Sequence, residues 1–255
     1  MGKLKETAKV ISQEEITKDI FSMWIETAIA KGSLPGQFIS VYTKDPSRLL
    51  PRPISICETK GDLLRIVYRI AGKGTKEFST YKEGDKVDIL GPLGNGFPLD
   101  EGSGKTSILI GGGIGIPPML ELSKRLKGDK IIVLGYRDAD TFLDKELASY
   151  GRIVIATDDG SLGTKGNVID AIKEQGVKGD VIYACGPTPM LKGVRAYSIE
   201  KGIKAYISLE ERMACGVGAC LGCVCKTVDT DDHSKVNNAR ICKDGPVFNA
   251  MEVEL

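Results

Sequence analysis

Histidine is almost absent from this chain, which has a single residue of that type, His233, among 255. A mechanism built on a histidine triad or on a histidine-rich metal site is therefore nearly excluded. Excess charge of one sign is also lacking, because 35 basic and 34 acidic residues leave a net charge of +1. That balance gives no reason to expect a nucleic acid or an anionic membrane surface as a partner.

Long apolar runs are missing as well. The longest apolar stretch, residues 108–120, is broken by Gly and Pro and cannot span a bilayer. The first ten residues are charged and lack the apolar core of a signal peptide. Seven cysteines, an odd number with most of them near the C-terminus, do not resemble a secreted disulfide framework. We therefore expect a cytoplasmic globular protein with no membrane partner.

The most informative segment is the cysteine loop, residues 214–225, ACGVGACLGCVC, which is followed by a further cysteine, Cys242. Cys215, Cys220 and Cys223 have the C-x4-C-x2-C spacing of the plant-type pattern for a [2Fe–2S] cluster. The alternatives are structural zinc, whose ligands usually come as two short-spaced pairs of Cys or His, and unligated thiols or disulfides. The spacing and the Gly-rich loop favour a one-electron iron–sulfur centre.

The first hundred residues are predicted to form short strands separated by turns rich in Gly, Pro and Asp, which is typical of an antiparallel β-barrel. After about residue 101, continuous apolar runs alternate with helix-like segments, which favours a parallel sheet covered by helices. We predict an N-terminal antiparallel β-barrel in residues 1–100, an α/β parallel-sheet nucleotide-binding domain in 101–210 and a small C-terminal cluster-binding subdomain in 211–255.

A glycine-rich turn, GGGIGIPP, follows the first apolar run of the second unit and precedes a helix-like segment. Gly111, Gly112, Gly113 and Gly115 would allow backbone N–H groups to face a phosphate at the start of that helix. The turn is not the G-x-G-x-x-G fingerprint, because position 116 is Ile116. A plain tight turn in an α/β unit is the alternative.

The barrel half carries a second candidate site, which begins with the sequence PRPISI. Arg52 supplies a forked donor for a phosphate, and Ser55 can donate to a polar ring or a ribityl group. Further along, Tyr68 offers an aromatic face and Arg69 a second cation, while Gly74–Thr75 would present backbone amides to a pyrophosphate. The alternative is that both arginines are surface residues and that Tyr68 belongs to the barrel core.

A third candidate site is ACGPTPML, at the end of a predicted central strand. Ligands of open parallel sheets bind beyond the carboxyl ends of the strands. Cys185, followed by Gly186 and Pro187, would place a small polarizable side chain where a nicotinamide could lie. A buried structural cysteine is the alternative there, and Cys57 is interpreted as core filler with no ligand role.

Together these motifs resemble those of the ferredoxin–NADP reductase superfamily. The cysteine loop, with GPLGNGFPL at 91–99 and CKDGPVF at 242–248, narrows the resemblance to the electron transfer subunits of class 1B dihydroorotate dehydrogenases. The resemblance extends over essentially the whole chain. It implies that the barrel binds FAD, that the α/β domain binds NAD, and that the C-terminal subdomain binds a [2Fe–2S] cluster.

The resemblance also assigns residues to each cofactor. The implied FAD contacts are Arg52, Pro53, Ile54, Ser55, Val67, Tyr68, Arg69, Gly74 and Thr75. The candidate NAD contacts are Gly111, Gly112, Gly113, Gly115, Cys185, Gly186 and Pro187. The implied cluster ligands are Cys215, Cys220, Cys223 and Cys242. Cys225 is the alternative fourth ligand, although an extended loop would hold it too close to Cys223 to approach the cluster from the opposite side.

In that family, an FMN-containing catalytic subunit oxidises dihydroorotate, and electrons then pass through the cluster and FAD to NAD+ in pyrimidine (UMP) biosynthesis. The resemblance implies an oxidoreductase subunit with NADH diaphorase activity, joined to the catalytic chain in a heterotetramer of two copies each. Flavin converts between two-electron and one-electron transfer, so no catalytic side chain is assigned. The alternatives are a diaphorase subunit of a hydrogenase or ferredoxin:NADP oxidoreductase complex, and a zinc-stabilised flavodomain acting as a binding module.

NAD is favoured over NADP by charge. A 2′-phosphate needs basic residues at a strand end, whereas Asp158 and Asp159 follow the third apolar run of the second unit. Arg137, which follows the second run, is the argument for NADP.

Overall fold

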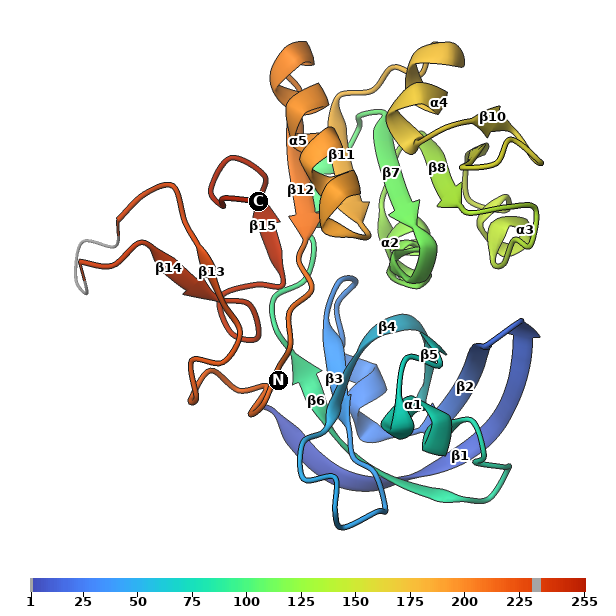
Figure 1. Cartoon of the computed structure of the whole chain (residues 1–255), viewed down its shortest axis with the longest axis vertical. Coiled ribbons are helices and arrows are strands. Elements are labelled where there is room, and N and C mark those ends of the chain that lie inside the picture. The colour runs from blue at the N-terminus through green and yellow to red at the C-terminus, as the bar shows by residue number, and fades with distance from the viewer. Residues whose placement is uncertain (1, 231–234) are drawn as a thin grey trace.

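The computed structural model describes residues 2–230 and 235–255, and most of its strands belong to a barrel or to a larger open sheet (Figure 1). Six strands close the barrel in the order β1-β2-β5-β4-β3-β6, and every neighbouring pair is antiparallel. The strands are β1 (Leu4–Thr17), β2 (Ile20–Glu26), β3 (Phe38–Val41), β4 (Arg52–Lys60), β5 (Leu63–Arg69) and β6 (Lys86–Leu93). The predicted N-terminal antiparallel barrel is confirmed.

The barrel strands alternate in burial, as a sheet with one buried face requires. In β6, Val87 and Ile89 point into the barrel and are buried, while Lys86 and Asp88 are exposed. Two short helices interrupt the strands, η1 (Ala28–Gly32) and α1 (Lys73–Phe78).

The second sheet has seven strands in the order β10-β9-β8-β7-β11-β12-β15, and the first six of them are parallel. The parallel strands are β7 (Ser107–Gly112), β8 (Lys130–Tyr136), β9 (Arg152–Thr157), β10 (Thr164–Lys165), β11 (Val181–Cys185) and β12 (Lys204–Ser208). With their connecting helices they form the α/β domain that is predicted to bind a nucleotide, hereafter the nucleotide domain. These helices are η2 (Leu99–Gly102), η3 (Gly113–Gly115), α2 (Pro117–Arg125), α3 (Asp144–Leu147), α4 (Val168–Glu174) and α5 (Thr188–Lys201).

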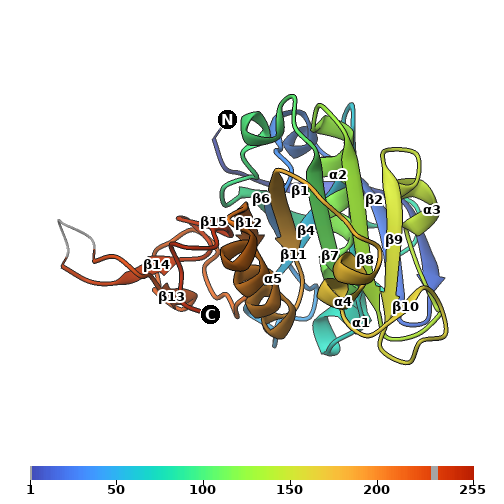
Figure 2. The ribbon, with the colours of Figure 1, turned by 90° about the horizontal axis from the view of Figure 1, so that it is seen from above.

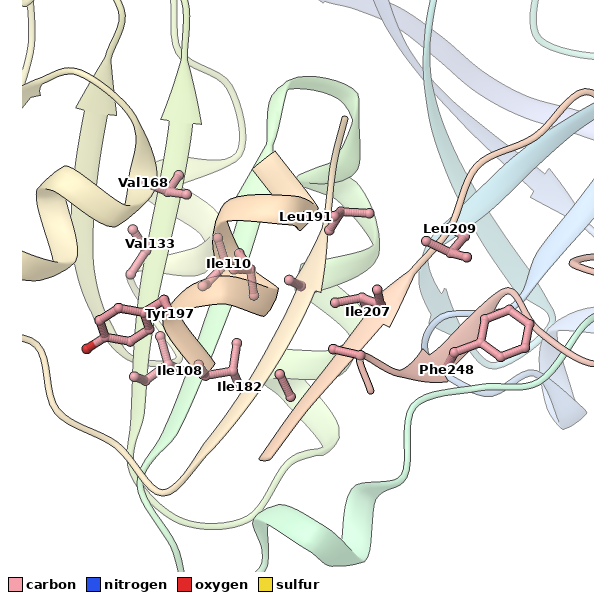
Figure 3. Packing of buried hydrophobic residues seen from close by; sticks show 14 of the residues in the cluster. Ile108, Ile110, Val133, Val168, Ile182, Leu191, Tyr197, Ile207, Leu209 and Phe248 are labelled. Carbon is pink, nitrogen blue, oxygen red and sulfur yellow. The ribbon is translucent and has the colours of Figure 1, made fainter. Parts of the chain in front are cut away.

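Helices cover both faces of this sheet, so its central strands are apolar on both sides. Along β7, Ile108 and Ile110 pack with α4 and α5, as Figure 3 shows for Val168 and Leu191. Leu109 points the other way and belongs to the cluster that contains α2. The continuous apolar runs of the sequence arise from this double burial, and the predicted parallel-sheet domain is confirmed.

The C-terminal segment leaves the sheet after β12, forms the hairpin of β13 (Val224–Lys226) and β14 (Asn238–Arg240), and then returns. The hairpin projects to one side of the molecule (Figure 2). On its return the chain adds β15 (Val247–Asn249) antiparallel to β12. The sequence did not predict this last strand, which ties the cysteine-rich segment to the nucleotide domain. Among the described residues, no helix is long and apolar enough to cross a bilayer.

Candidate functional site

A cavity of about 320 Å³ lies between the barrel and the chain that follows β12. Most of the residues expected to contact FAD line it, namely Arg52, Pro53, Ile54, Ser55, Val67, Tyr68, Arg69 and Thr75. The PRPISI motif can line the cavity because β5 pairs with β4 only from Ile56 onward, while the four residues before it pair with β3 alone. One edge of β4 is therefore free of strand partners along the motif.

Arg52 is held in place from two sides. Its guanidinium donates to the carbonyl oxygen of Leu50, and its side chain passes directly over Gly74. A Cβ atom on Gly74 would lie 2.7 Å from the Arg52 Nε atom, closer than real Cβ contacts. The glycine is therefore needed for the arginine to run across the start of α1. Thr75 braces the same turn, because its Oγ1 accepts hydrogen bonds from the N–H groups of Ala71 and Gly72.

Tyr68 both borders the cavity and belongs to the barrel core, which are the two alternatives considered from the sequence. It lines the cavity, yet its side chain is 1% exposed and its hydroxyl donates to Gln13 Oε1 at 2.7 Å. Burial raises the pKa of that hydroxyl. The phenol is therefore neutral and fixed inside the barrel, and only part of the ring borders the cavity.

A second cavity, of about 300 Å³, opens at the carboxyl ends of the parallel strands. The chain order reverses between β7 and β11, since β8, β9 and β10 lie on one side of β7 and β11 lies on the other. Such a switch point is where open α/β sheets bind ligands. Five of the seven candidate NAD contacts line the cavity: Gly112 ends β7, and Gly113, Gly115, Gly186 and Pro187 follow the ends of β7 and β11.

Two of the candidate NAD contacts do not line the cavity. Gly111 is inside β7, and Cys185 is the last residue of β11 and is 1% exposed. Burial raises the pKa of the Cys185 thiol, which stays neutral. The Cys185 carbonyl oxygen leaves no room for a side chain at Gly115, because a Cβ atom there would lie 2.3 Å from that oxygen. The two turns therefore pack backbone against backbone.

The charges that bear on coenzyme choice divide between the cavity and its surroundings. Arg137 and Asp158 both line the second cavity. Asp159 is turned away, and its carboxylate accepts hydrogen bonds from the N–H and hydroxyl groups of Ser161, which lower its pKa. One carboxylate and one guanidinium therefore face the expected ribose end of the coenzyme.

Replacing Asp158 by serine is expected to raise the kcat/KM for NADPH relative to NADH by at least about 10-fold, because the carboxylate repels a 2′-phosphate and Arg137 then faces it alone. Steady-state NAD(P)H oxidation with an artificial acceptor measures the ratio. Asp159→Ser is the matched control, and an equal effect of both variants would contradict the assignment of Asp158.

The two cavities adjoin, since Arg69, Ile114 and Glu210 line both. Glu210 was not singled out from the sequence, because it lies in the connection between β12 and the cysteine loop with no motif around it. Desolvation by the surrounding cavity walls raises the pKa of its carboxyl although the residue reaches solvent, and the nearby Arg69 partly offsets this effect. A titratable carboxyl thus borders both candidate cofactor sites.

The four expected cluster ligands form two pairs in the structure. Cys215 and Cys220 are close enough for Cys220 to lower the pKa of the Cys215 thiol, and Cys223 Sγ accepts the Cys242 N–H at 3.4 Å. Within residues 2–230 and 235–255, no three Cys, His, Asp or Glu side chains converge as the ligands of one ion would. Two pairs of thiols are the donor set of a two-iron centre, because two bridging sulfides leave each tetrahedral iron two thiolate positions.

Backbone amides of the cysteine loop point at these sulfur atoms. Cys215 Sγ accepts N–H groups from Val217 at 3.5 Å and Ala219 at 3.3 Å. Partial burial opposes ionisation of Cys215, but these donors and Cys220 outweigh it and lower its thiol pKa to about 6. Gly218, with φ of +88°, adopts the left-handed conformation that the loop needs between them. Iron ligation requires thiolates, so the loop fits the cluster.

Cys225 lies near this group but on a different element. It sits on β13, where it pairs with Ala239, and burial raises its thiol pKa. Cys242 instead lies against Cys223. Burial, together with the neighbouring Cys223, raises the pKa of the Cys242 thiol. The arrangement favours Cys242 as the fourth ligand, and the choice stays a prediction. The single histidine lies outside the described residues.

The residue that immediately precedes the cysteine loop borders the first cavity. Met213, two residues before Cys215, lines that cavity together with Pro246, four residues after Cys242. On the barrel side, Gly216 packs so closely that a Cβ atom there would lie 2.9 Å from Ser40 Oγ. The cluster site, the first cavity and the second cavity are therefore neighbours in that order.

Comparison with known proteins defines the class of this chain. Residues 109–196 match the oxidoreductase NAD-binding domain family, and residues 210–254 match the iron–sulfur cluster binding domain of dihydroorotate dehydrogenase B. A ferredoxin NADP+ reductase from Neisseria gonorrhoeae, 18% identical, shares the fold over 82% of this chain and 94% of its own, with a TM-score of 0.66. The chain therefore has the fold of a ferredoxin NADP+ reductase, with an oxidoreductase NAD-binding domain and an added iron–sulfur cluster binding domain.

Full-length relatives identify the family. The dihydroorotate dehydrogenase B (NAD+) electron transfer subunit of Listeria monocytogenes serotype 4a is 46% identical over 99% of this chain and 100% of its own length. The corresponding subunit of Bacillus cereus strain B4264 is 44% identical over 98% and 99%. This chain belongs to the family of electron transfer subunits of NAD-dependent dihydroorotate dehydrogenase B. The structure of an NADH-dependent reduced ferredoxin–NADP oxidoreductase is also similar, at 30% identity and a TM-score of 0.87, covering 98% of this chain and 90% of that one.

Proposed function

We propose that this chain transfers electrons between NAD+ and an FMN-containing, dihydroorotate-oxidising catalytic subunit in pyrimidine (UMP) biosynthesis. The observation that carries the proposal is the contiguity of three sites. Arg69, Ile114 and Glu210 are common to both cavities, and Met213 connects the first cavity to the cysteine loop. Electron transfer between a partner protein and a nicotinamide requires such a continuous series of sites.

Each site has residues suited to one cofactor. Arg52 and the turn at Gly74–Thr75 would hold the pyrophosphate of FAD, with the open edge of β4 beside the flavin. The glycine turn after β7 and the turn at Gly186 would hold NAD. Cys215, Cys220, Cys223 and Cys242 would ligate a [2Fe–2S] cluster. A bound flavin supplies the exchange between the two-electron chemistry of nicotinamide and the one-electron chemistry of the cluster.

The electron transfer role predicts what the chain does alone and what it does with its partner. The chain alone would oxidise NADH with artificial acceptors, and it would need the catalytic subunit for dihydroorotate. We propose a heterotetramer with two copies of each chain, located in the cytoplasm.

Reconstitution tests this function. Mixing the cofactor-loaded chain anaerobically with a dihydroorotate dehydrogenase catalytic subunit is expected to give dihydroorotate-dependent reduction of NAD+, followed by absorbance at the NADH band. Neither chain alone is expected to catalyse that reaction, whereas this chain alone should reduce ferricyanide with NADH. A protein that purifies with zinc and no iron, or a mixture without NAD+ reduction, would overturn the proposal.

The structural similarity to an NADH-dependent reduced ferredoxin–NADP oxidoreductase supports a second candidate, a diaphorase subunit of another flavin and iron–sulfur complex. Anaerobic co-purification separates the two candidates through the identity of the chain that accompanies this one. A dihydroorotate-oxidising partner favours the first candidate, and a second pyridine nucleotide reductase or a hydrogenase favours the other.

A further inference from the structure

The barrel and the nucleotide domain meet a second time, at helix α2, which lies on the side of its domain nearest the barrel (Figure 1). Glu121 of α2 is 3% exposed. Its carboxylate accepts the backbone N–H of Thr59 at 3.0 Å and the Thr59 hydroxyl at 2.9 Å, and Arg125 Nε donates to it at 2.6 Å. Arg125 also donates to the Thr59 hydroxyl at 3.1 Å. A buried carboxylate therefore joins α2 to strand β4.

A second group of charges reinforces this junction. Arg65 of β5 is 5% exposed, and it donates two hydrogen bonds to Glu146 of α3, at 2.7 and 3.1 Å. Glu58 of β4 receives Lys124 of α2 at 2.6 Å and Arg65 at 3.3 Å. Burial acts to lower the pKa of Lys124, but the hydrogen bond to Glu58 outweighs it and the pKa is raised. These charges link the neighbouring barrel strands β4 and β5 to helices α2 and α3.

The charges at the junction are balanced. Three carboxylates (Glu58, Glu121, Glu146) face three cations (Arg65, Lys124, Arg125). None of these residues lines either cavity. In some proteins, paired ionic groups that are largely buried favour one arrangement of the surrounding elements over others while adding little net stability. The network is therefore suited to setting the relative orientation of the two domains rather than to binding a cofactor.

Both elements joined by Glu121 lead directly to a cofactor site. Thr59 lies four residues beyond Ser55 on the same strand, roughly 13 Å along it at the usual rise. Glu121 lies one helical turn after Pro117, and the glycine turn of the second cavity immediately precedes that helix. A small rotation of α2 against β4 would therefore change how closely the two cavities approach each other.

We propose that Glu121 is a positioning residue, which fixes α2 to Thr59 and thereby sets the distance between the flavin and nicotinamide sites. The inference rests on the proposed use of these two cavities for FAD and NAD. Transfer of a hydride depends steeply on the separation of the reacting atoms, and a displacement of about 1 Å can cost about 100-fold in rate. The residue touches neither cofactor site, so its effect is on geometry alone.

The test compares Glu121→Gln with the wild-type holo-protein in stopped-flow reduction of the flavin by NADH. We expect the limiting rate to fall at least about 10-fold, while FAD content stays unchanged and the apparent Kd for NADH changes by less than about 3-fold, because both binding surfaces remain intact. Amide hydrogen exchange should increase in the peptides that cover 117–125 and 52–60. That readout does not depend on activity.

Glu101→Gln is the matched control, since the Glu101–Lys204 ion pair lies within the nucleotide domain and joins no second domain. It should leave the rate and the exchange pattern unchanged. Thr59→Val, which keeps the backbone hydrogen bond, serves if Glu121→Gln does not fold, and it should lower the rate about 3-fold with an unchanged Kd. If a folded, FAD-loaded variant of Glu121 or Thr59 is reduced at the wild-type rate, the positioning role of Glu121 is overturned while the proposed function stands. A wild-type holo-protein that NADH does not reduce would overturn the proposed function itself.

Discussion

Replacing Cys242 by serine is expected to abolish cluster binding and to lower dihydroorotate-dependent NAD+ reduction by at least about 100-fold. Cys242 is 1% exposed and lies against Cys223, with its N–H 3.4 Å from the Cys223 sulfur. A hydroxyl in that position is a poor substitute for the thiolate that iron requires. Iron analysis and low-temperature electron paramagnetic resonance of the reduced protein measure the loss directly.

Cys225→Ser is the matched control, because Cys225 is a nearby half-buried cysteine on β13 that pairs with Ala239. It should keep its iron, its spectrum and its activity with the catalytic subunit. NADH oxidation with ferricyanide should survive in both variants, since neither cysteine lines the first cavity, the proposed FAD site. Loss of the cluster in Cys225→Ser, with retention in Cys242→Ser, would reverse the assignment of the fourth ligand.

Replacing Arg52 by alanine is expected to weaken FAD binding by about 10- to 100-fold, the range for losing one charge-assisted contact worth about 1.5–3 kcal/mol. Arg52 is the first residue of β4, lines the cavity, and is held by the Leu50 carbonyl. Its guanidinium is therefore already in position before a pyrophosphate binds, so little side-chain entropy is lost on binding. FAD release on dilution, followed by flavin fluorescence, measures the change.

Gly74→Ala tests the same contact without removing the charge. The added Cβ atom would lie 2.7 Å from Arg52 Nε and would displace the side chain from its position over the turn. FAD binding should weaken in this variant too, whereas Arg152→Ala, an exposed arginine at the start of β9, should bind FAD normally. Unchanged FAD affinity in both Arg52→Ala and Gly74→Ala would exclude Arg52 as a flavin contact.

Much of the site could be predicted from the sequence, because its chemistry depends on residues that are close together in the chain. The spacing of Cys215, Cys220 and Cys223 points to a cluster because three ligands on one short loop are constrained by that loop alone. The glycine turn after β7 could be located for a similar reason, since it follows an apolar run and precedes a helix. The barrel and the parallel sheet were predictable because one buried face and two buried faces leave different apolar patterns along a strand.

The surroundings of individual side chains were harder to predict from the sequence. Cys185 was expected beside a nicotinamide, but its position at the end of β11 buries it beneath the cavity wall. Tyr68 was weighed as either a flavin contact or a core residue, and its hydrogen bond to Gln13, across the barrel, makes it part of both. For Tyr68, a residue from another strand decides the outcome, and no local pattern reports that residue.

The class of protein, its two main units and the loop ligands Cys215, Cys220 and Cys223 could be predicted from the sequence, because each depends on motifs whose residues lie close together in the chain. Only the folded chain shows that Cys242 lies against Cys223, that Glu210 borders both cavities, and that β15 completes the second sheet. It also shows that Glu121 binds Thr59, 62 residues away. Contacts between distant segments form only when the domains pack, and their geometry follows from the burial of whole faces rather than from any motif.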